Sequence, residues 1–200
     1  MIRSVYYNQT DILRSIMALN RIDQFEADIS YGNGVFYKNI QEPIFKCDIS
    51  PQVDGVIECS SSNLYWCETG QLTSIVFDPP FLTYIKAARE HNSIMAKRFG
   101  GYWRYDELEK HYKETITEVY RALKKKGLFI FKCQDIIHNH KMHCTHVNVI
   151  NWCDGLFRLK DLFILPAKQR MGIPEKTGEK KRIQKHARVF HSYFLVLERL

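Results

Sequence analysis

The stretch Ser74-Ile75-Val76-Phe77-Asp78-Pro79-Pro80-Phe81 joins a run of apolar, strand-forming residues to an acid, two prolines and an aromatic ring. Open α/β sheets bind ligands at the carboxyl ends of their strands, so Asp78 and Phe81 are expected at a binding edge. The prolines lack N–H groups, which leaves nearby carbonyls free to accept hydrogen bonds, and Phe81 offers a ring face for stacking. These residue types suit a flat ring that carries an amine, although an ordinary Asp-Pro turn after a strand has the same composition.

A glycine turn lies about fifty residues earlier, in Phe25-Glu26-Ala27-Asp28-Ile29-Ser30-Tyr31-Gly32-Asn33-Gly34. Glycines allow a sharp turn and a close approach of the backbone to a ligand. A helix after the turn would present free N–H groups at its start. A lone Gly-x-Gly is most often a plain turn. Combined with the Asp-Pro-Pro-Phe segment, it indicates a nucleotide-cofactor site.

Strand and helix patterns alternate along the chain, which predicts a βαβ sheet with helices on both faces. Helices are expected from about Thr10 through Leu19, from Tyr105 to Lys125 and over about His143–Cys153. Thr10 is the expected N-cap of the first helix, and Gly127 is expected to end the second. Strands are expected near Phe25–Ile29, Ile44–Asp48, Val56–Cys59, Ser74–Asp78, Leu128–Lys132, Phe157–Leu165 and His191–Leu197.

Length and composition favour one compact domain, because 200 residues with 45% hydrophobic side chains can bury a substantial core. Neither a run of eighteen apolar residues nor a signal-peptide pattern is present in this sequence, so we expect a soluble protein. The six cysteines, at positions 47, 59, 67, 133, 144 and 153, lack a Cys-x-x-Cys pair. They predict reduced, buried thiols and a cytoplasmic location.

The net charge of +7 and the pI near 9.1 indicate a polyanionic partner. Basic residues concentrate before the last expected strand, where a solvated loop and a phosphate-binding segment would have the same composition. The residues that we expect to bind nucleic acid are Lys180, Lys181, Arg182, Lys185 and Arg188.

The glycine turn and the Asp-Pro-Pro-Phe segment resemble two motifs of S-adenosylmethionine-dependent amino-methyltransferases of nucleic acid. The similarity is greatest to small phage- and plasmid-type N6-adenine DNA methyltransferases, which carry Asp-Pro-Pro-Tyr/Phe/Trp and Asp-x-Thr-Tyr-Gly-x-Gly-x-Phe. The second motif is matched here by Asp28, Ser30, Tyr31, Gly32, Gly34 and Phe36. Serine replaces the usual threonine in it, and the resemblance extends over nearly the whole chain.

This resemblance implies a single Rossmann-like class I methyltransferase domain over residues 1–200, with a mostly parallel seven-stranded sheet and helices on both faces. It implies S-adenosylmethionine as cofactor, nucleic acid (above all DNA) as partner, a monomer or homodimer, and no metal. Segments 86–103 and 168–188 would be the loops that contact the substrate. The catalytic residues that it implies are Asp78, Pro79, Pro80 and Phe81.

Under the same resemblance, Asp78 and the Pro79 carbonyl would accept hydrogen bonds from the target amine, and Phe81 would stack on the base. The cofactor-binding residues that it implies are Asp28, Ser30, Tyr31, Gly32, Gly34, Asp48 and Ser60. The family usually has an acid where this chain has Ser60, and a hydroxyl binds an amine more weakly than a carboxylate does. Either cofactor affinity is reduced, or Glu58 takes this role in a different register.

Several alternatives remain open at this level. Asp-Pro-Pro-Phe also resembles motifs of RNA adenine methyltransferases and of protein lysine N-methyltransferases, and cytosine-N4 enzymes more often show Ser-Pro-Pro-Tyr. A catalytically silent nucleic-acid-binding protein on the same scaffold is a further alternative. The segment His138–His146 is rich in metal-binding side chains, but its spacing does not follow a regular zinc pattern.

Overall fold

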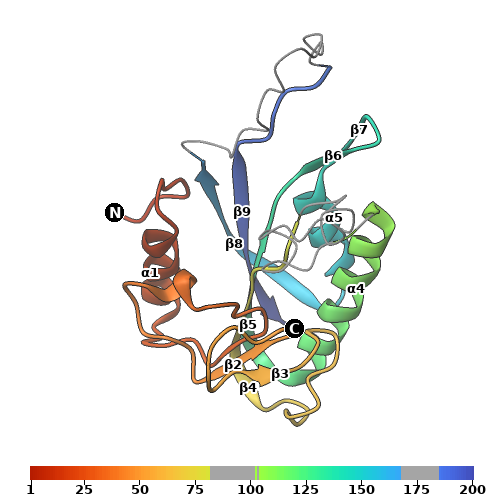
Figure 1. Ribbon diagram of the computed structural model, residues 1–200. Helices are drawn as coiled ribbons and strands as arrows, with labels where there is room; N and C mark the ends of the chain where they lie inside the picture. Colours follow the sequence, from red (N-terminus) through yellow and green to blue (C-terminus); the bar gives the residue numbers. More distant parts are fainter. Residues whose placement is uncertain (82–101, 103, 168–184) are drawn as a thin grey trace.

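The computed structural model describes residues 1–81, 102, 104–167 and 185–200 (Figure 1). Seven strands form one sheet in the order β3-β2-β1-β4-β5-β9-β8. Neighbouring strands from β3 to β5 are parallel, and β9 runs antiparallel to both β5 and β8. The expected mostly parallel, seven-stranded sheet is therefore confirmed. The strands are β1 (Ala27–Asp28), β2 (Phe45–Asp48), β3 (Ile57–Glu58), β4 (Leu72–Phe77), β5 (Leu123–Cys133), β8 (Phe157–Pro166) and β9 (His191–Arg199).

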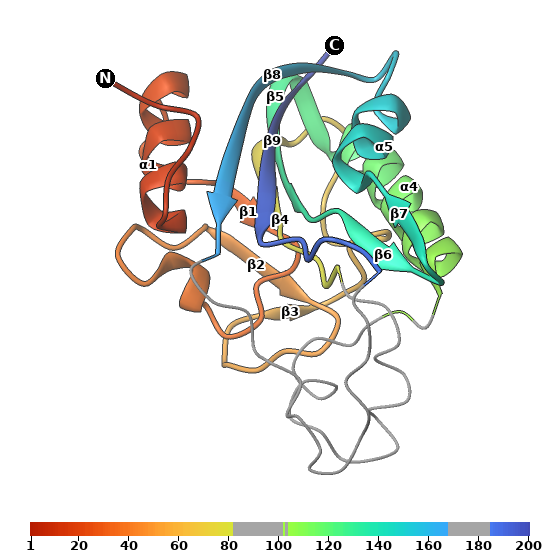
Figure 2. The ribbon, with the colours of Figure 1, turned by 90° about the horizontal axis from the view of Figure 1, so that it is seen from above.

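Helices cover both faces of this sheet, as the alternating pattern predicts. Seen from above, α1 (Gln9–Asn20) lies on one side of the strands, and α4 (Tyr105–Ala122) and α5 (Thr145–Trp152) lie on the other (Figure 2). A short 3-10 turn, η1 (Val35–Tyr37), lies on the α1 side. A separate hairpin, β6 (Ile136–His138) and β7 (Lys141–His143), follows β5.

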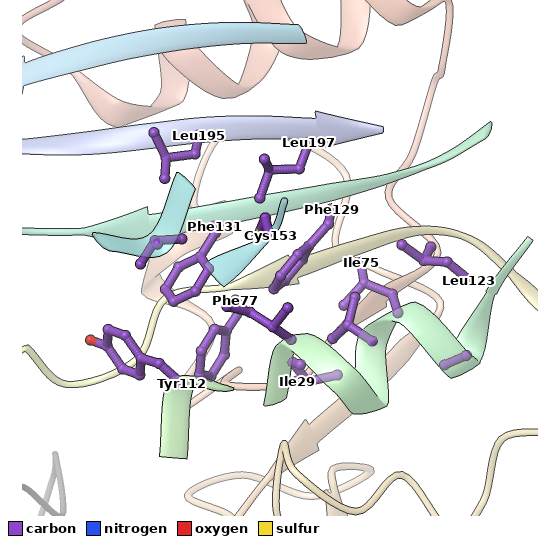
Figure 3. Packing of buried hydrophobic residues seen from close by; sticks show 14 of the residues in the cluster. Ile29, Ile75, Phe77, Tyr112, Leu123, Phe129, Phe131, Cys153, Leu195 and Leu197 are labelled. Carbon is purple, nitrogen blue, oxygen red and sulfur yellow. The ribbon is translucent and has the colours of Figure 1, made fainter. Parts of the chain in front are cut away.

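The central strand β4 is buried on both faces, which explains its apolar sequence. Its Ile75 and Phe77 side chains belong to the larger core cluster beneath α4, whereas Val76 belongs to the cluster beneath α1. Figure 3 shows Phe77 within the larger cluster, where its ring centroid lies 5.0 Å from that of Phe131 and 6.0 Å from that of Tyr112. This packing fixes the carboxyl end of β4, from which the Asp-Pro-Pro-Phe segment leaves the sheet.

The boundaries of all three helices differ from the sequence-based expectation, and α5 begins at Thr145 rather than at His143, which lies in β7. Asn8, and not Thr10, is the N-cap of α1, because its side-chain oxygen accepts a hydrogen bond from the Thr10 amide at 2.9 Å. The second helix ends at Ala122 rather than at Lys125, and Gly127 lies inside β5. Leu123 is fully buried and pairs with Leu72 of β4, so burial in the sheet outweighs the helix propensity of the lysines that follow.

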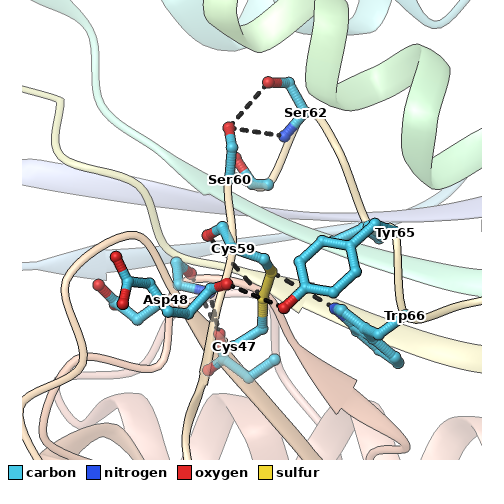
Figure 4. Close-up of a disulfide and its surroundings, with 12 residues drawn as sticks. Cys47, Asp48, Cys59, Ser60, Ser62, Tyr65 and Trp66 are labelled. Atoms are coloured by element: carbon cyan, nitrogen blue, oxygen red, sulfur yellow. Dashed lines mark hydrogen bonds between the residues drawn. A yellow bond between two sulfur atoms is a disulfide. The ribbon is translucent and has the colours of Figure 1, made fainter.

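The cysteines also differ in part from the expectation of free thiols. Cys47 on β2 and Cys59 just after β3 form a disulfide (Figure 4). Because β2 and β3 are parallel neighbours, the Cα atoms of the two cysteines lie 6.0 Å apart, which is within the range that a disulfide spans. The free cysteines are Cys67, Cys133 and Cys153, which are buried, and Cys144, which is exposed. Among the helices of the described segments, none has the length and apolar character needed to cross a membrane.

Candidate functional site at the carboxyl edge of the sheet

The glycine turn follows β1 and is held between β2 and β4. The Ile29 amide donates to the Val76 carbonyl and the Tyr31 amide to the Cys47 carbonyl, each at 3.0 Å. Gly32 and Gly34 both have positive φ angles, of 60° and 76°. A Cβ atom on Gly34 would lie 2.5 Å from the Tyr31 hydroxyl, but one on Gly32 would meet no atom within 4 Å. Gly34 thus serves the packing of the turn, and Gly32 borders open space.

Asp48 ties the end of β2 to this turn. One of its carboxylate oxygens accepts from the Gly32 amide at 2.8 Å, and the other accepts from the Ser50 amide at 2.8 Å. A carboxylate offers about four acceptor positions, so these two bonds leave capacity for a ligand. The structure therefore brings Asp48 beside the glycine turn, although the two are sixteen positions apart in the sequence.

Ser60 lies two residues beyond β3, at the same edge of the sheet. Its hydroxyl forms a hydrogen bond with the Ser62 hydroxyl at 2.8 Å (Figure 4). The disulfide fixes the neighbouring residue Cys59 to Cys47, which itself precedes Asp48. Glu58, the alternative to Ser60, is exposed and pairs in register with Asp48. The two candidate acceptors for an adenine amine thus stay close to Asp48 along adjacent strand ends.

Asp28 is buried, with an exposed fraction of 1%, and its carboxylate is bound within the fold. One oxygen accepts from the amide and the hydroxyl of Ser30, at 2.7 Å and 3.1 Å, and the other accepts from the Tyr37 hydroxyl at 2.6 Å. Burial, together with the nearby charge of Asp78, raises the pKa of Asp28 to about 7, against the hydrogen bonds that lower it. Its contacts hold the turn in place, and any effect on a cofactor passes through that turn.

The raised pKa of Asp28 predicts a pH-dependent stability. Between its ordinary pKa of 3.8 and the folded value of about 7, the folded protein keeps a proton that the unfolded chain has lost. The proton on Asp28 therefore stabilises the fold fully below pH 3.8, and this stabilisation is lost as the pH rises to about 7. Asp28→Asn removes this titration. When the pH is raised from about 5 to about 8, the free energy of unfolding of wild type should therefore fall relative to that of the variant.

Urea denaturation of both proteins at the two pH values measures this change. Asp23→Asn, which alters an exposed acid in the segment before β1, is the matched control and should keep a constant difference from wild type. A difference between Asp28→Asn and wild type that stays the same at both pH values would contradict the assignment.

Asp78 follows β4 directly and has two partners that fix it. Its amide donates to the Ser30 hydroxyl oxygen at 2.6 Å, and that hydroxyl donates to Asp28. Its carboxylate forms an ion pair with Lys132 at 2.8 Å, and the side chains of Asp78 and Lys132 are 23% and 11% exposed. A hydrogen-bonded path therefore connects the end of β4 with the glycine turn.

Lys132 is a site residue that the sequence analysis does not identify. It lies on β5, one position beyond Phe131, which pairs in register with Phe77, so it stands level with Asp78. Its ammonium group lies 5.0 Å from the ring centroid of Phe36 and 5.5 Å from that of Phe194. The signal that could have revealed it is a charged residue directly after the buried apolar run Leu128-Phe129-Ile130-Phe131.

The prolines and Phe81 complete the segment. Pro79 is buried, and Pro80 and Phe81 are partly exposed. The Pro80 carbonyl accepts a hydrogen bond from the buried Tyr112 hydroxyl at 3.3 Å. This bond to α4 restrains the turn that carries Phe81.

Other predicted residues lie apart from this cluster or outside the described residues. Lys180, Lys181 and Arg182 lie outside, as do segments 168–184 and 86–103 apart from Tyr102. Lys185 and Arg188 are exposed and precede β9, which begins past the carboxyl end of β5. In the described part of the chain, no group of three or more His, Cys, Asp or Glu side chains is arranged to hold a metal ion.

Comparisons with known proteins place this geometry in a fold class. No protein-family model matches the chain, and no curated protein matches it. Among solved structures, an rRNA methylase from Streptococcus thermophilus is similar over 100% of this chain and 99% of its own, at 13% identity and a TM-score of 0.50. A protein described as a type 11 methyltransferase from Sulfolobus solfataricus is similar over 96% and 92%, at 16% identity and a TM-score of 0.50.

A third structure is a protein described as a DNA modification methylase from Thermus thermophilus, solved with S-adenosyl-L-methionine. It is 16% identical, with a TM-score of 0.45 and a match over 70% of this chain and 52% of its own. This chain thus spans about half the length of that protein. At these identities the similarity concerns the fold, and the fold is that of the Rossmann-like methyltransferases.

Proposed function

We propose that this chain is an S-adenosylmethionine-dependent N-methyltransferase of nucleic acid, with the exocyclic N6 amine of adenine in DNA as its target. The observation that carries the proposal is the position of Asp78. It is a carboxylate at the carboxyl end of the central strand, held by Ser30 and Lys132 and connected to the glycine turn. In open α/β sheets this edge is the place where ligands bind.

The residues around the glycine turn suit the proposed cofactor. Gly32 borders open space, and Asp48 has acceptor capacity for ribose hydroxyls beside it. Ser60 would bind the adenine amine as a neutral acceptor, and Tyr31 and Gly34 shape the turn. S-adenosylmethionine, when bound, supplies a methyl group on a sulfonium ion, which needs no further activation by a metal.

Asp78 would act on the target amine. The lone pair of an adenine amine is delocalised into the ring, and hydrogen bonds from its two N–H groups to acceptors favour a tetrahedral, more nucleophilic nitrogen. Asp78 and the Pro79 carbonyl are the proposed acceptors, because the Pro80 carbonyl already accepts from Tyr112. Phe81 would stack on the base.

Nucleic acid as the substrate is supported by the net charge of +7 and by the exposed Lys185 and Arg188, which precede β9. Lys180, Lys181 and Arg182 are proposed as further phosphate contacts. The amine of a paired adenine is out of reach inside a duplex, so the base would be extruded or unpaired before transfer.

The direct test is methyl transfer from tritiated S-adenosylmethionine by the purified chain. DNA, RNA and protein from unmethylated cells serve as parallel substrates, and mass spectrometry identifies the modified nucleoside. The proposal predicts N6-methyladenine in DNA. Product on RNA adenine, cytosine N4 or lysine would replace the substrate assignment, and nucleic-acid binding without any transfer would indicate a silent scaffold.

A further inference from the structure

The β6–β7 hairpin continues the strand that carries Lys132. Three residues separate Lys132 from the start of β6 at Ile136. The hairpin forms its own two-stranded sheet and leaves the carboxyl edge of the main sheet (Figures 1 and 2). An extended chain from Lys132 to the turn of the hairpin spans up to roughly 20 Å, at about 3.3 Å per residue. The hairpin therefore starts at the proposed catalytic edge and projects away from it.

Its backbone is defined by a two-residue turn. Asn139 and His140 have φ angles of 48° and 59°, and the flanking pair His138 and Lys141 are in register. Positive φ at both central residues is typical of the tight hairpin turn whose twist matches that of the strands. The hairpin thus presents its tip in one defined orientation.

The base of the hairpin is anchored to the body of the protein, which an isolated two-stranded ribbon needs for stability. Ile136 is buried, and the His143 ring stacks on Tyr105 of α4 with centroids 3.7 Å apart. Just before β6, the buried Asp135 accepts hydrogen bonds from the His146 amide at 3.2 Å and from its ring nitrogen at 2.7 Å. These contacts fix the β6–β7 hairpin relative to the edge of the sheet.

The tip, in contrast, is exposed and basic. His140, Lys141 and Met142 are exposed, and Met142 keeps 43% of its surface accessible. The hairpin residues 136 to 143 include three histidines and one lysine but no aspartate or glutamate. The β6–β7 hairpin therefore has no acidic side chain of its own that would repel an anion.

We infer that the β6–β7 tip, residues 139–142, contacts the backbone of nucleic acid several nucleotides from the target base. Lys141 would bind a phosphate, and His140 and Met142 would contact the adjoining sugar and base surface. The inference rests on the proposed function for its substrate class, but it concerns binding and not transfer. In this inference the β6–β7 hairpin positions the nucleic-acid strand across the proposed catalytic edge.

Fluorescence anisotropy with a 20-base-pair DNA duplex and the RNA duplex of the same sequence tests this inference without cofactor. For the duplex that wild type binds more tightly, Lys141→Ala should weaken binding and lower the salt dependence by about one phosphate contact. Lys141→Arg should retain both. Lys125→Ala is the matched control, because Lys125 is an exposed strand lysine at the opposite end of β5. Equal effects of Lys141→Ala and Lys125→Ala would overturn the inference, as would a wild type that binds neither duplex.

The exposed Cys144 beside β7 offers a second readout. A saturating duplex should slow its alkylation by iodoacetamide several-fold, and the buried Cys67, Cys133 and Cys153 are internal references. An unchanged rate at Cys144 would contradict the contact. Because neither readout uses methyl transfer, protection of Cys144 by a duplex supports contact between the hairpin tip and nucleic acid even where the transfer assay is negative.

Discussion

Methyl transfer by the Asp78→Ala variant should fall by about 10²–10³-fold, the range found when one preorganised hydrogen-bonding group is removed from a reacting centre. The loss follows because the target amine would no longer have its charged acceptor. Cofactor affinity should stay within a few-fold of wild type, since Asp48 and the glycine turn are untouched. Single-turnover methylation of adenine-containing DNA, with N6-methyladenine quantified by mass spectrometry, measures the change.

Stability must be separated from chemistry in this experiment. Asp78→Ala leaves the largely buried Lys132 ammonium without its ion-pair partner, which destabilises the fold. The double variant Asp78→Ala/Lys132→Met removes that charge and keeps an unbranched side chain against Phe36 and Phe194. It should recover stability in urea denaturation but stay inactive. Recovery of activity in the double variant would show that Asp78 acts through the fold.

The second large effect is expected for Gly32→Val, in the binding of S-adenosylmethionine. The new side chain would enter the open space beside the turn, so calorimetry should show an affinity at least about tenfold lower. A left-handed φ angle costs a non-glycine residue about 1–2 kcal/mol, which sets the expected loss of stability. Gly70→Val, with a φ angle of 69° and open surroundings before β4, has the same backbone cost and should bind normally.

Gly34→Ala should affect stability more than cofactor binding, the opposite of Gly32→Val. Its added methyl group meets the Tyr31 ring, so the free energy of unfolding should fall by about 2–5 kcal/mol from backbone strain and overpacking together. If Gly32→Val binds S-adenosylmethionine as wild type does, the cofactor site lies elsewhere on the sheet.

The sequence predicted the parts of this structure that local patterns determine. The apolar run of β4 is buried on both faces, and the regular apolar spacing of the second helix matches the side of α4 that contacts the sheet. The glycine turn and the Asp-Pro-Pro-Phe segment could be assigned to one site from their residue types and from the family resemblance, but the contacts between them could not be predicted. The structure joins them through the hydrogen bonds of Ser30 with Asp28 and Asp78.

What the sequence could not supply depends on contacts between distant segments. Lys132 meets Asp78 because β4 and β5 pair in one particular register, and Tyr37 meets Asp28 because η1 folds back beneath the turn. The early end of α4 has the same origin, since burial of Leu123 beside β4 decides it. Each of these features belongs to pairs of elements and is absent from either element alone.

The Cys47–Cys59 disulfide has a consequence for how the sheet opens. β3 contains two residues and is the outermost strand, so few ladder hydrogen bonds resist its separation from β2. A covalent link across a sequence separation of 12 residues limits how far the two strands can part during local opening. In hydrogen exchange, the amides near Ser60 should therefore be more protected in the oxidised chain than in the reduced one. The edge of a Rossmann-like sheet, usually its most readily opened part, is here a constrained one.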